Sequence, residues 1–170
     1  MHADLQPSNW VVRWASLVER GPVLDVASGA GRHAKLFAAR GLEVVAVDRE
    51  PRVIPGVEVV AADLEDGRPW PFAERRFGAV VVTNYLHRPL LPALGASLAE
   101  NGVLIYETFM AGHERFGKPS NPNFLLRPGE LLEAFGALTV VAFEQGTTGK
   151  AVIQRICAIR AEASRVRIVS

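Results

Sequence analysis

The stretch from residue 23 to residue 34 constrains the fold of this chain more than any other. A short apolar run, Val23 to Val26, passes through small residues directly into an Ala-rich segment of helical character. This pattern predicts a buried strand, a tight turn and the N-terminus of a helix. Such a turn presents backbone N–H groups and the positive end of a helix dipole to a ligand. Gly29 and Gly31 permit the turn and let a ligand approach the backbone.

Two ligand classes compete for this turn. Residues 29–34 fit the dinucleotide pattern G-x-G-x-x-G/A, and Asp48 follows at about the ~20-residue offset of a ribose-binding acid. That interpretation gives a nicotinamide-dependent oxidoreductase. Asp25 favours the other class, because a carboxylate inside the first strand would repel a pyrophosphate and would suit an ammonium or sulfonium group. A turn without any ligand is disfavoured, since a buried and unpartnered Asp25 would be costly.

Residues 25–31 resemble motif I, D-x-G-x-G-x-G, of the class I S-adenosylmethionine-dependent methyltransferases, with Ala27 in place of the first glycine. The resemblance extends over about residues 20 to 160 and implies S-adenosyl-L-methionine as the cofactor. Around the turn it implies a set of cofactor-binding residues: Asp25, Ala27, Ser28, Gly29, Gly31 and His33.

The ends of the next two expected strands add further cofactor-binding residues by the same resemblance. Asp48 ends a strand expected over residues 43–48, and in the family an acid there accepts hydrogen bonds from the ribose hydroxyls; Arg49 follows it. Asp63 and Leu64 end a strand expected over residues 57–63, at the position that binds adenine in the family. Strand ends on the carboxyl side of a parallel sheet line the ligand crevice, which agrees with these roles.

The expected fourth strand, residues 79–84, leads into the methyl-transfer region of the resembling enzymes. Asn84 is implied in cofactor contact, and Asn84, Tyr85 and His87 are the candidate catalytic residues. Methyl transfer from a sulfonium needs positioning and at most a general base, so no covalent nucleophile is expected. His87 is the candidate base, because a histidine with a pKa near ~6.5 can accept a proton at neutral pH. A surface or capping role for His87 is an equal alternative.

The rest of the pattern predicts an α/β fold: a Rossmann-like, doubly wound seven-stranded sheet in a three-layer sandwich. The sheet is mostly parallel, and the resemblance adds an antiparallel C-terminal hairpin at its edge. One methyltransferase domain spans residues 1–170, with an N-terminal helical segment over residues 1–20. Residues 49–56 are too short and proline-rich for a crossover helix. Other expected elements are helices over 8–20, 32–40 and 92–100, a short helix from 129, and strands over 103–109, 138–144 and 151–159.

Residues 110–128 lose all periodicity and are rich in Gly, Pro and Asn. A loop of this length in a compact domain is usually functional, so we expect a lid over the site. His113 and Glu114 in this segment are candidates for substrate contacts. The stretch from Glu107 to Leu131 resembles a bacterial subgroup near the tellurite-resistance-type methyltransferases.

Length, composition and charge limit the classes of partner expected for this chain. A chain of 170 residues suits one domain, and a net charge of +1 argues against a general nucleic-acid footprint. The expected acceptor is therefore a small molecule, and a protein or RNA acceptor is less favoured. Cys157 is the one cysteine, and neither a leader nor a membrane span is apparent, so a cytoplasmic protein without a membrane partner is expected. The dispersed histidines, His2, His33, His87 and His113, predict no metal site.

The sequence thus predicts an S-adenosylmethionine-dependent methyltransferase with an unidentified small-molecule acceptor. A nicotinamide-dependent oxidoreductase is one alternative. A non-catalytic cofactor-binding module that regulates a partner is the other, because a missing crossover helix at residues 49–56 would leave an apolar face open to association. The oligomeric state is left open.

Overall fold

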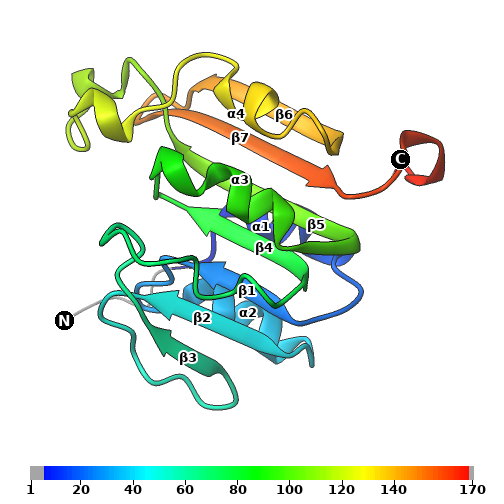
Figure 1. Cartoon of the computed structure of the whole chain (residues 1–170). Coiled ribbons are helices and arrows are strands. Elements are labelled where there is room, and N and C mark those ends of the chain that lie inside the picture. Colours follow the sequence, from blue (N-terminus) through cyan, green and yellow to red (C-terminus); the bar gives the residue numbers. More distant parts are fainter. Residues whose placement is uncertain (1–5, 169–170) are drawn as a thin grey trace.

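The apolar runs of the sequence assemble into one seven-stranded sheet, which a computed structural model describes for residues 6–168 (Figure 1). Residues 1–5, part of the expected N-terminal segment, lie outside this description. The strand order is β3-β2-β1-β4-β5-β7-β6. The strands are β1 Val23–Val26, β2 Val44–Asp48, β3 Glu58–Ala61, β4 Phe77–Thr83, β5 Leu98–Phe109, β6 Thr139–Thr147 and β7 Val152–Ile159.

The first five strands of that order run parallel, and β7 pairs antiparallel with both β5 and β6. The predicted doubly wound sheet with an antiparallel C-terminal edge hairpin is therefore confirmed. Parallel strands bury both faces, which is why β1, β2 and β4 read as continuous apolar runs rather than alternating ones.

Helices cover both faces of the sheet and give the predicted three layers (Figure 1). Helices α1 Asn9–Trp14 and α2 Arg32–Ala39 lie on one face, and α3 Leu91–Ala96 and α4 Glu130–Ala134 lie on the other. The first face buries Trp10 and Phe37 with one set of strand residues, and the second buries Phe72 and Phe135 with the alternate set. Trp10 is fully buried and donates its indole N–H to the Ile156 carbonyl, so it packs on the sheet as expected.

Two predicted helices end earlier than expected. The N-terminal helix continues only as a 3-10 turn over Ala15–Leu17 instead of reaching Arg20, because Val18 turns extended and is buried in the core. The helix predicted over residues 92–100 ends at Ala96. Leu98 is fully buried and pairs with Phe77 as the first residue of β5.

Asn101 and Gly102, predicted as a helix stop, form an irregularity inside β5 instead. Asn101 has a left-handed φ of 64°, and its N–H donates to the Arg160 carbonyl at 2.8 Å. The residues that oppose β4 jump from Leu98 to Val103 across this point. A turn signal that normally ends a helix is thus used to bulge a strand, because tertiary pairing overrides the local preference.

The crossover between β2 and β3 contains no helix, as the two prolines predicted. Residues 49–57 form a loop whose one deeply buried apolar side chain is Ile54. β3 at the sheet edge is correspondingly half-exposed.

Gly78, at the start of β4, lies where the fold leaves no room for a side chain. A Cβ at Gly78 would lie 1.8 Å from the Arg20 carbonyl oxygen, because residues 20–22 cross directly over the start of β4. The Gly78 N–H donates to the Pro22 carbonyl at 2.9 Å. The segment that enters β1 therefore requires a residue without a side chain at this point.

Replacing Gly78 by Ala should destabilise the fold by about 3 kcal/mol, because the clash is with backbone rather than with a flexible side chain. Gly95→Ala is the matched control. A Cβ there meets nothing closer than 3.7 Å inside α3, so the change should be neutral or stabilise by roughly 0.5–1 kcal/mol. Urea unfolding of both variants tests this, and equal stabilities would contradict it.

Candidate functional site

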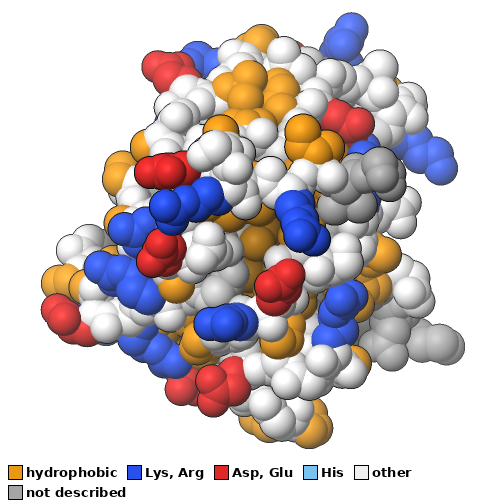
Figure 2. Space-filling view, turned by 90° about the vertical axis from the view of Figure 1, so that its right-hand side faces the viewer, with side chains coloured by type: hydrophobic (Ala, Val, Ile, Leu, Met, Phe, Trp, Pro, Cys, Tyr) orange, Lys and Arg blue, Asp and Glu red, His pale blue; other side chains and the backbone are white. Residues whose placement is uncertain are grey.

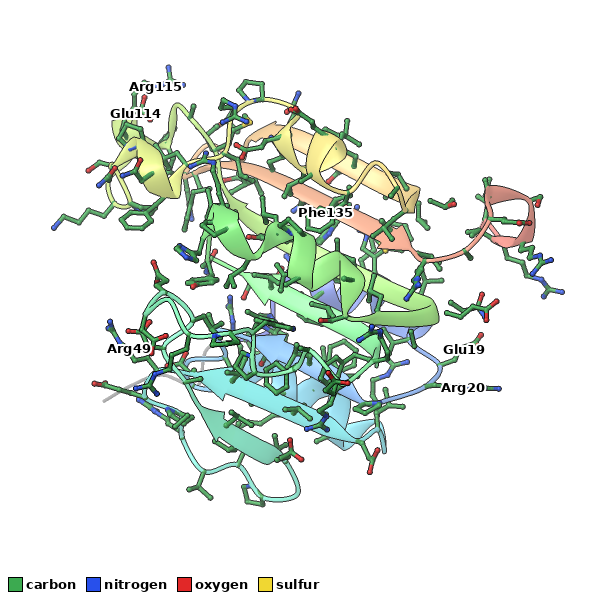
Figure 3. All side chains as sticks on the ribbon, in the orientation of Figure 1. Glu19, Arg20, Arg49, Glu114, Arg115 and Phe135 are labelled. Carbon is green, nitrogen blue, oxygen red and sulfur yellow. The ribbon has the colours of Figure 1, made fainter. Side chains whose placement is uncertain are left out.

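The carboxyl ends of the parallel strands gather most of the predicted site residues at one end of the molecule. Val26 pairs with Val47 in β2 and with Val82 in β4, so the three strands finish almost level. In Figure 3 Arg49 and Glu114 lie at this end, whereas Glu19 and Arg20 lie at the opposite end. Strand ends of this kind form the crevice in which α/β proteins bind ligands.

The turn between β1 and α2 is left-handed at three residues. Ala27 and Gly29 both have φ of 53°, and Gly31 has φ of 80°. A Cβ at Gly31 would lie 2.2 Å from the Ile54 side chain, so Gly31 provides packing space for the β2–β3 loop. A Cβ at Gly29 would meet no atom within 4 Å, so the backbone there is open to a ligand. Ala27 adopts a conformation that costs a non-glycine residue roughly 1–2 kcal/mol.

Asp25 lies behind this turn rather than in the crevice. Its side chain is 2% exposed, and its Oδ2 accepts a hydrogen bond from the Ala34 N–H in α2 at 3.0 Å. Burial raises the pKa of this carboxyl from 3.8 to about 7, although the Ala34 hydrogen bond acts in the opposite direction. Asp25 therefore ties the first turn of α2 to the centre of β1.

The Asp48 carboxylate is hydrogen-bonded to the backbone of the glycine turn. The Asp48 carboxylate accepts from the Gly29 N–H through Oδ2 and from the Glu50 N–H through Oδ1, both at 2.9 Å. Asp63 has a similar arrangement at the end of β3, where its Oδ1 accepts from the Glu65 N–H at 2.9 Å. Each carboxylate keeps further lone pairs for a ligand.

A cavity of about 210 Å³ opens between these strand ends. It brings together one predicted catalytic residue and five predicted cofactor-binding residues with two neighbours: Ala27, Asp48, Arg49, Ala62, Asp63, Leu64, Glu65 and Tyr85. The other predicted cofactor residues are not among its lining residues. The Ser28 carbonyl accepts from the Gly31 N–H within the turn, and Asn84 turns the chain after β4 with a left-handed φ of 53°.

His33 faces the N-terminal segment. Its Nε2 accepts from the Ser8 N–H at 3.0 Å, and its Nδ1 lies 3.4 Å from the Thr83 hydroxyl at the end of β4. Burial, together with the nearby Arg32, lowers the pKa of His33 to about 4, so the ring is neutral at physiological pH. His33 thus connects the start of α1 to the end of β4.

Glu65 is a site residue that the sequence interpretation missed. One of its carboxylate oxygens lies 3.4 Å from His87 Nδ1, and Glu65 also lines the cavity beside Tyr85. Burial, followed by the charge of Glu65, raises the pKa of Tyr85, which therefore remains a neutral phenol. No motif marked Glu65 in the sequence; its position two residues after Asp63 was the one available signal.

The predicted lid, residues 110–128, is firmly attached to the rest of the molecule. Met110 bridges to Leu126, and both ring nitrogens of His113 are used: Nδ1 accepts from the Val152 N–H and Nε2 lies 3.1 Å from the Lys118 carbonyl. Arg88, just after β4, makes two contacts of 2.8 and 3.0 Å with the Glu130 carboxylate. Its guanidinium also donates to the carbonyls of Asn123 and Leu125.

Three further features concern metal binding, membrane insertion and the charge of the surface. Among residues 6–168 there is no group of three or more His, Cys, Asp or Glu side chains placed to hold a metal ion. No helix in that part of the chain is long and apolar enough to cross a bilayer. On the face opposite the crevice, acidic and basic side chains are interspersed (Figure 2).

Comparison with solved structures identifies the fold. TehB from Haemophilus influenzae superposes with a TM-score of 0.73 at 14% identity, covering 91% of this chain and 62% of that one. This chain thus spans less than two thirds of the length of TehB. The Burkholderia thailandensis 1,6-didemethyltoxoflavin-N1-methyltransferase, solved with 1,6-didemethyltoxoflavin and S-adenosylhomocysteine bound, gives 0.64 at 19% identity, with coverages of 90% and 76%. NodS, an N-methyltransferase from Bradyrhizobium japonicum, gives 0.63 at 16% identity, with coverages of 89% and 96%. No curated protein matches this chain in sequence.

The fold is that of the class I S-adenosylmethionine-dependent methyltransferases. Residues 24–100, a little under half of the chain, match the family model described as a methyltransferase domain. This match and the methyltransferase structures above agree with the predicted enzyme class and with S-adenosyl-L-methionine as its cofactor.

The buried Asp25 makes stability depend on pH in a specific direction. Because its folded pKa of about 7 exceeds the unfolded value of 3.8, its contribution is fully present below about pH 4 and is lost as the pH rises through 7. Asp25→Asn lacks this titration and can keep the acceptor for Ala34. Its stability relative to wild type should therefore rise between pH 4 and 8, by on the order of 3 kcal/mol.

Urea unfolding across that pH range measures the effect. Asp66→Asn is the control, because this acid lies on the surface loop and pairs with Arg68. A stability difference between Asp25→Asn and wild type that stays constant with pH would contradict the burial argument.

Proposed function

We propose that this chain transfers the methyl group of S-adenosyl-L-methionine to a small-molecule acceptor, with the cofactor held in the cavity at the ends of β1, β2 and β3. One observation carries the proposal: Asp48 and Asp63 line one cavity, and Asp48 also accepts a hydrogen bond from the open backbone at Gly29. Polar groups at successive strand ends suit a ligand that has a ribose, an adenine and a charged amino-acid end.

The residues present fit this cofactor. Asp48 is already fixed by two backbone N–H groups, so its free lone pairs would accept from ribose hydroxyls without further ordering. Asp63 is held by one backbone N–H, that of Glu65, and would accept from the exocyclic amine of adenine. The open space at Gly29 gives room for the ligand to approach the turn. Ala27 lines the cavity with a methyl group where the resembling motif has glycine.

The bound cofactor supplies an electrophilic methyl carbon on a sulfonium, and His87 is the residue that would handle a proton. Glu65 lies beside Nδ1 and favours the tautomer with hydrogen on that nitrogen. Nε2 is then the free base that takes a proton from the acceptor, and Glu65 stabilises the resulting imidazolium. Tyr85 lines the cavity, and Asn84 and Tyr85 precede His87 in the turn that follows β4.

The alternatives have less support. A nicotinamide-dependent oxidoreductase would place a pyrophosphate among Asp48, Asp63 and Glu65, where like charges repel it. A partner-regulating module without catalysis would leave the Glu65–His87 pair unexplained. A small-molecule acceptor agrees with the Burkholderia neighbour, which was solved with the small molecule 1,6-didemethyltoxoflavin bound. A cytoplasmic location agrees with the single, buried Cys157.

Calorimetric titration of S-adenosylhomocysteine and of NAD tests the cofactor assignment. The first should bind and the second should not. Asp48→Asn should weaken S-adenosylhomocysteine about ten- to a hundredfold, because charge-assisted hydrogen bonds to the ribose are lost. Asp66→Asn, a nearby acid that does not line the cavity, should bind like wild type. Binding of NAD in preference, or of neither ligand, would overturn the proposal.

The Glu65–His87 pair has a spectroscopic signature that needs no acceptor. Long-range proton–nitrogen NMR at about pH 8 should show His87 with its hydrogen on Nδ1, and Glu65→Ala should abolish that preference. The few histidines of the chain can be assigned by substitution. Asp66→Ala is the matched control and should leave the His87 signals unchanged. A hydrogen on Nε2 in the wild-type protein would remove the case for Nε2 as the base.

A further inference from the structure

A second and larger cavity lies between the lid segment and the turn that follows β4. Its volume is about 490 Å³, within the range of small-molecule sites. It is lined by Arg88 from the body of the protein and by Glu114, Ser120, Pro122, Leu125 and Arg127 from the lid segment and its end, together with Ala111. Tyr85 lines the cofactor cavity and Arg88 lines this one, so residues 85–88 connect the two.

The cavity is preformed, because an ion pair holds its walls together. Glu130 is 5% exposed and accepts from Arg88 Nε and from the Arg127 N–H, each at 2.8 Å. Arg88 also donates to two carbonyls of the lid segment. These contacts use most of the Arg88 donors and neutralise its charge. Arg88 and Glu130 therefore build the cavity rather than offer it a free charge.

Two charges of opposite sign remain available to a ligand. Arg127 is two-thirds exposed, and its guanidinium lies 3.7 Å from the already paired Glu130 carboxylate. Glu114 sits at the outer end of the lid segment, visible in Figure 3, and its carboxylate accepts from the Gly112 N–H at 2.7 Å. Hydrogen bonding to its own backbone N–H and to that of Gly112 lowers the pKa of Glu114, so it is ionised. Leu125 and Pro122 supply apolar surface beside them.

We infer that this cavity binds the methyl acceptor and that the acceptor is a zwitterion of the amino-acid type. Its carboxylate would face Arg127, its ammonium would face Glu114, and its apolar side chain would lie on Leu125 and Pro122. A purely anionic acceptor would meet Glu114, and a purely cationic one would meet Arg127, so either carries a repulsion that the zwitterion avoids. The inference rests on the proposed function, because the cavity is lined by Arg88, the residue that follows the proposed base His87.

The test uses the full chain saturated with S-adenosylhomocysteine. Saturation-transfer NMR is recorded with each of the protein amino acids, and the tightest binder is then compared with its deaminated and decarboxylated analogues. For leucine these are 4-methylpentanoate and 3-methylbutylamine. The amino acid should bind at least about tenfold more tightly than either analogue.

Substitutions at two exposed residues test the two charges one at a time and should leave the fold intact. Arg127→Gln should weaken the amino acid and its deaminated analogue about tenfold and leave the decarboxylated analogue unchanged. Glu114→Gln should do the reverse. Lys118→Gln is the control, because Lys118 is an exposed cation of the same segment that does not line the cavity. It should bind all three compounds like wild type.

The experiment separates a failure of the zwitterion assignment from a failure of the proposed function. Failure of S-adenosylhomocysteine itself to bind would overturn the methyltransferase proposal. If it binds and no amino acid does, or if the single-charge analogues bind equally well, the zwitterion assignment is wrong while the cofactor assignment stands. Binding that is insensitive to both Arg127→Gln and Glu114→Gln would place the amino acid outside this cavity.

Discussion

The hydrogen bond from the Ala34 N–H to the buried Asp25 carboxylate is the constraint around which the site is built. It fixes the first turn of α2 against the centre of β1, and the intervening loop must then close through three left-handed residues. In the same loop the Gly29 N–H donates to Asp48, and the absence of a side chain at Gly31 leaves room for the Ile54 side chain. A single buried contact thereby links β1, α2, β2 and the β2–β3 loop. Its cost is a carboxyl whose charge is poorly solvated, which explains the raised pKa.

The crevice gathers three acids beside Arg49, and backbone N–H groups hold two of these acids, Asp48 and Asp63. Asp48 and Asp63 each accept from the chain just beyond their own strand. These bonds hold the carboxylates in place before any ligand arrives, so a ligand would not have to order them. Glu65, the third acid that lines the cavity, contacts His87. On the other side, Arg88 and Glu130 fasten the lid segment, so the two cavities have walls set by separate polar contacts.

The hydrophobic pattern of the sequence predicted the strands of the sheet. The predictions that failed share one physical cause. Strands β1, β2 and β4 were predictable because they are buried on both faces and therefore almost entirely apolar, with Asp25 and Asp48 as the charged exceptions. The helix predicted to continue to Glu100 was wrong because Leu98 pairs with Phe77, a contact that local sequence does not contain. Asn101 and Gly102 look the same whether they end a helix or bulge a strand. Long-range pairing decides between them.

The sequence by itself determined the fold class of this protein. The order of strand, glycine turn and helix, with an acid inside the first strand and acids at the ends of the next two, needs only local chemistry and the geometry of a parallel sheet. Tertiary structure alone decided that Asp25 supports the turn from behind, that Glu65 reaches His87, and that Arg88 joins Glu130 from 42 positions away. It also decided that a separate cavity forms beneath the lid segment. Such contacts depend on how side chains meet across the folded chain, and no spacing in the sequence encodes that directly.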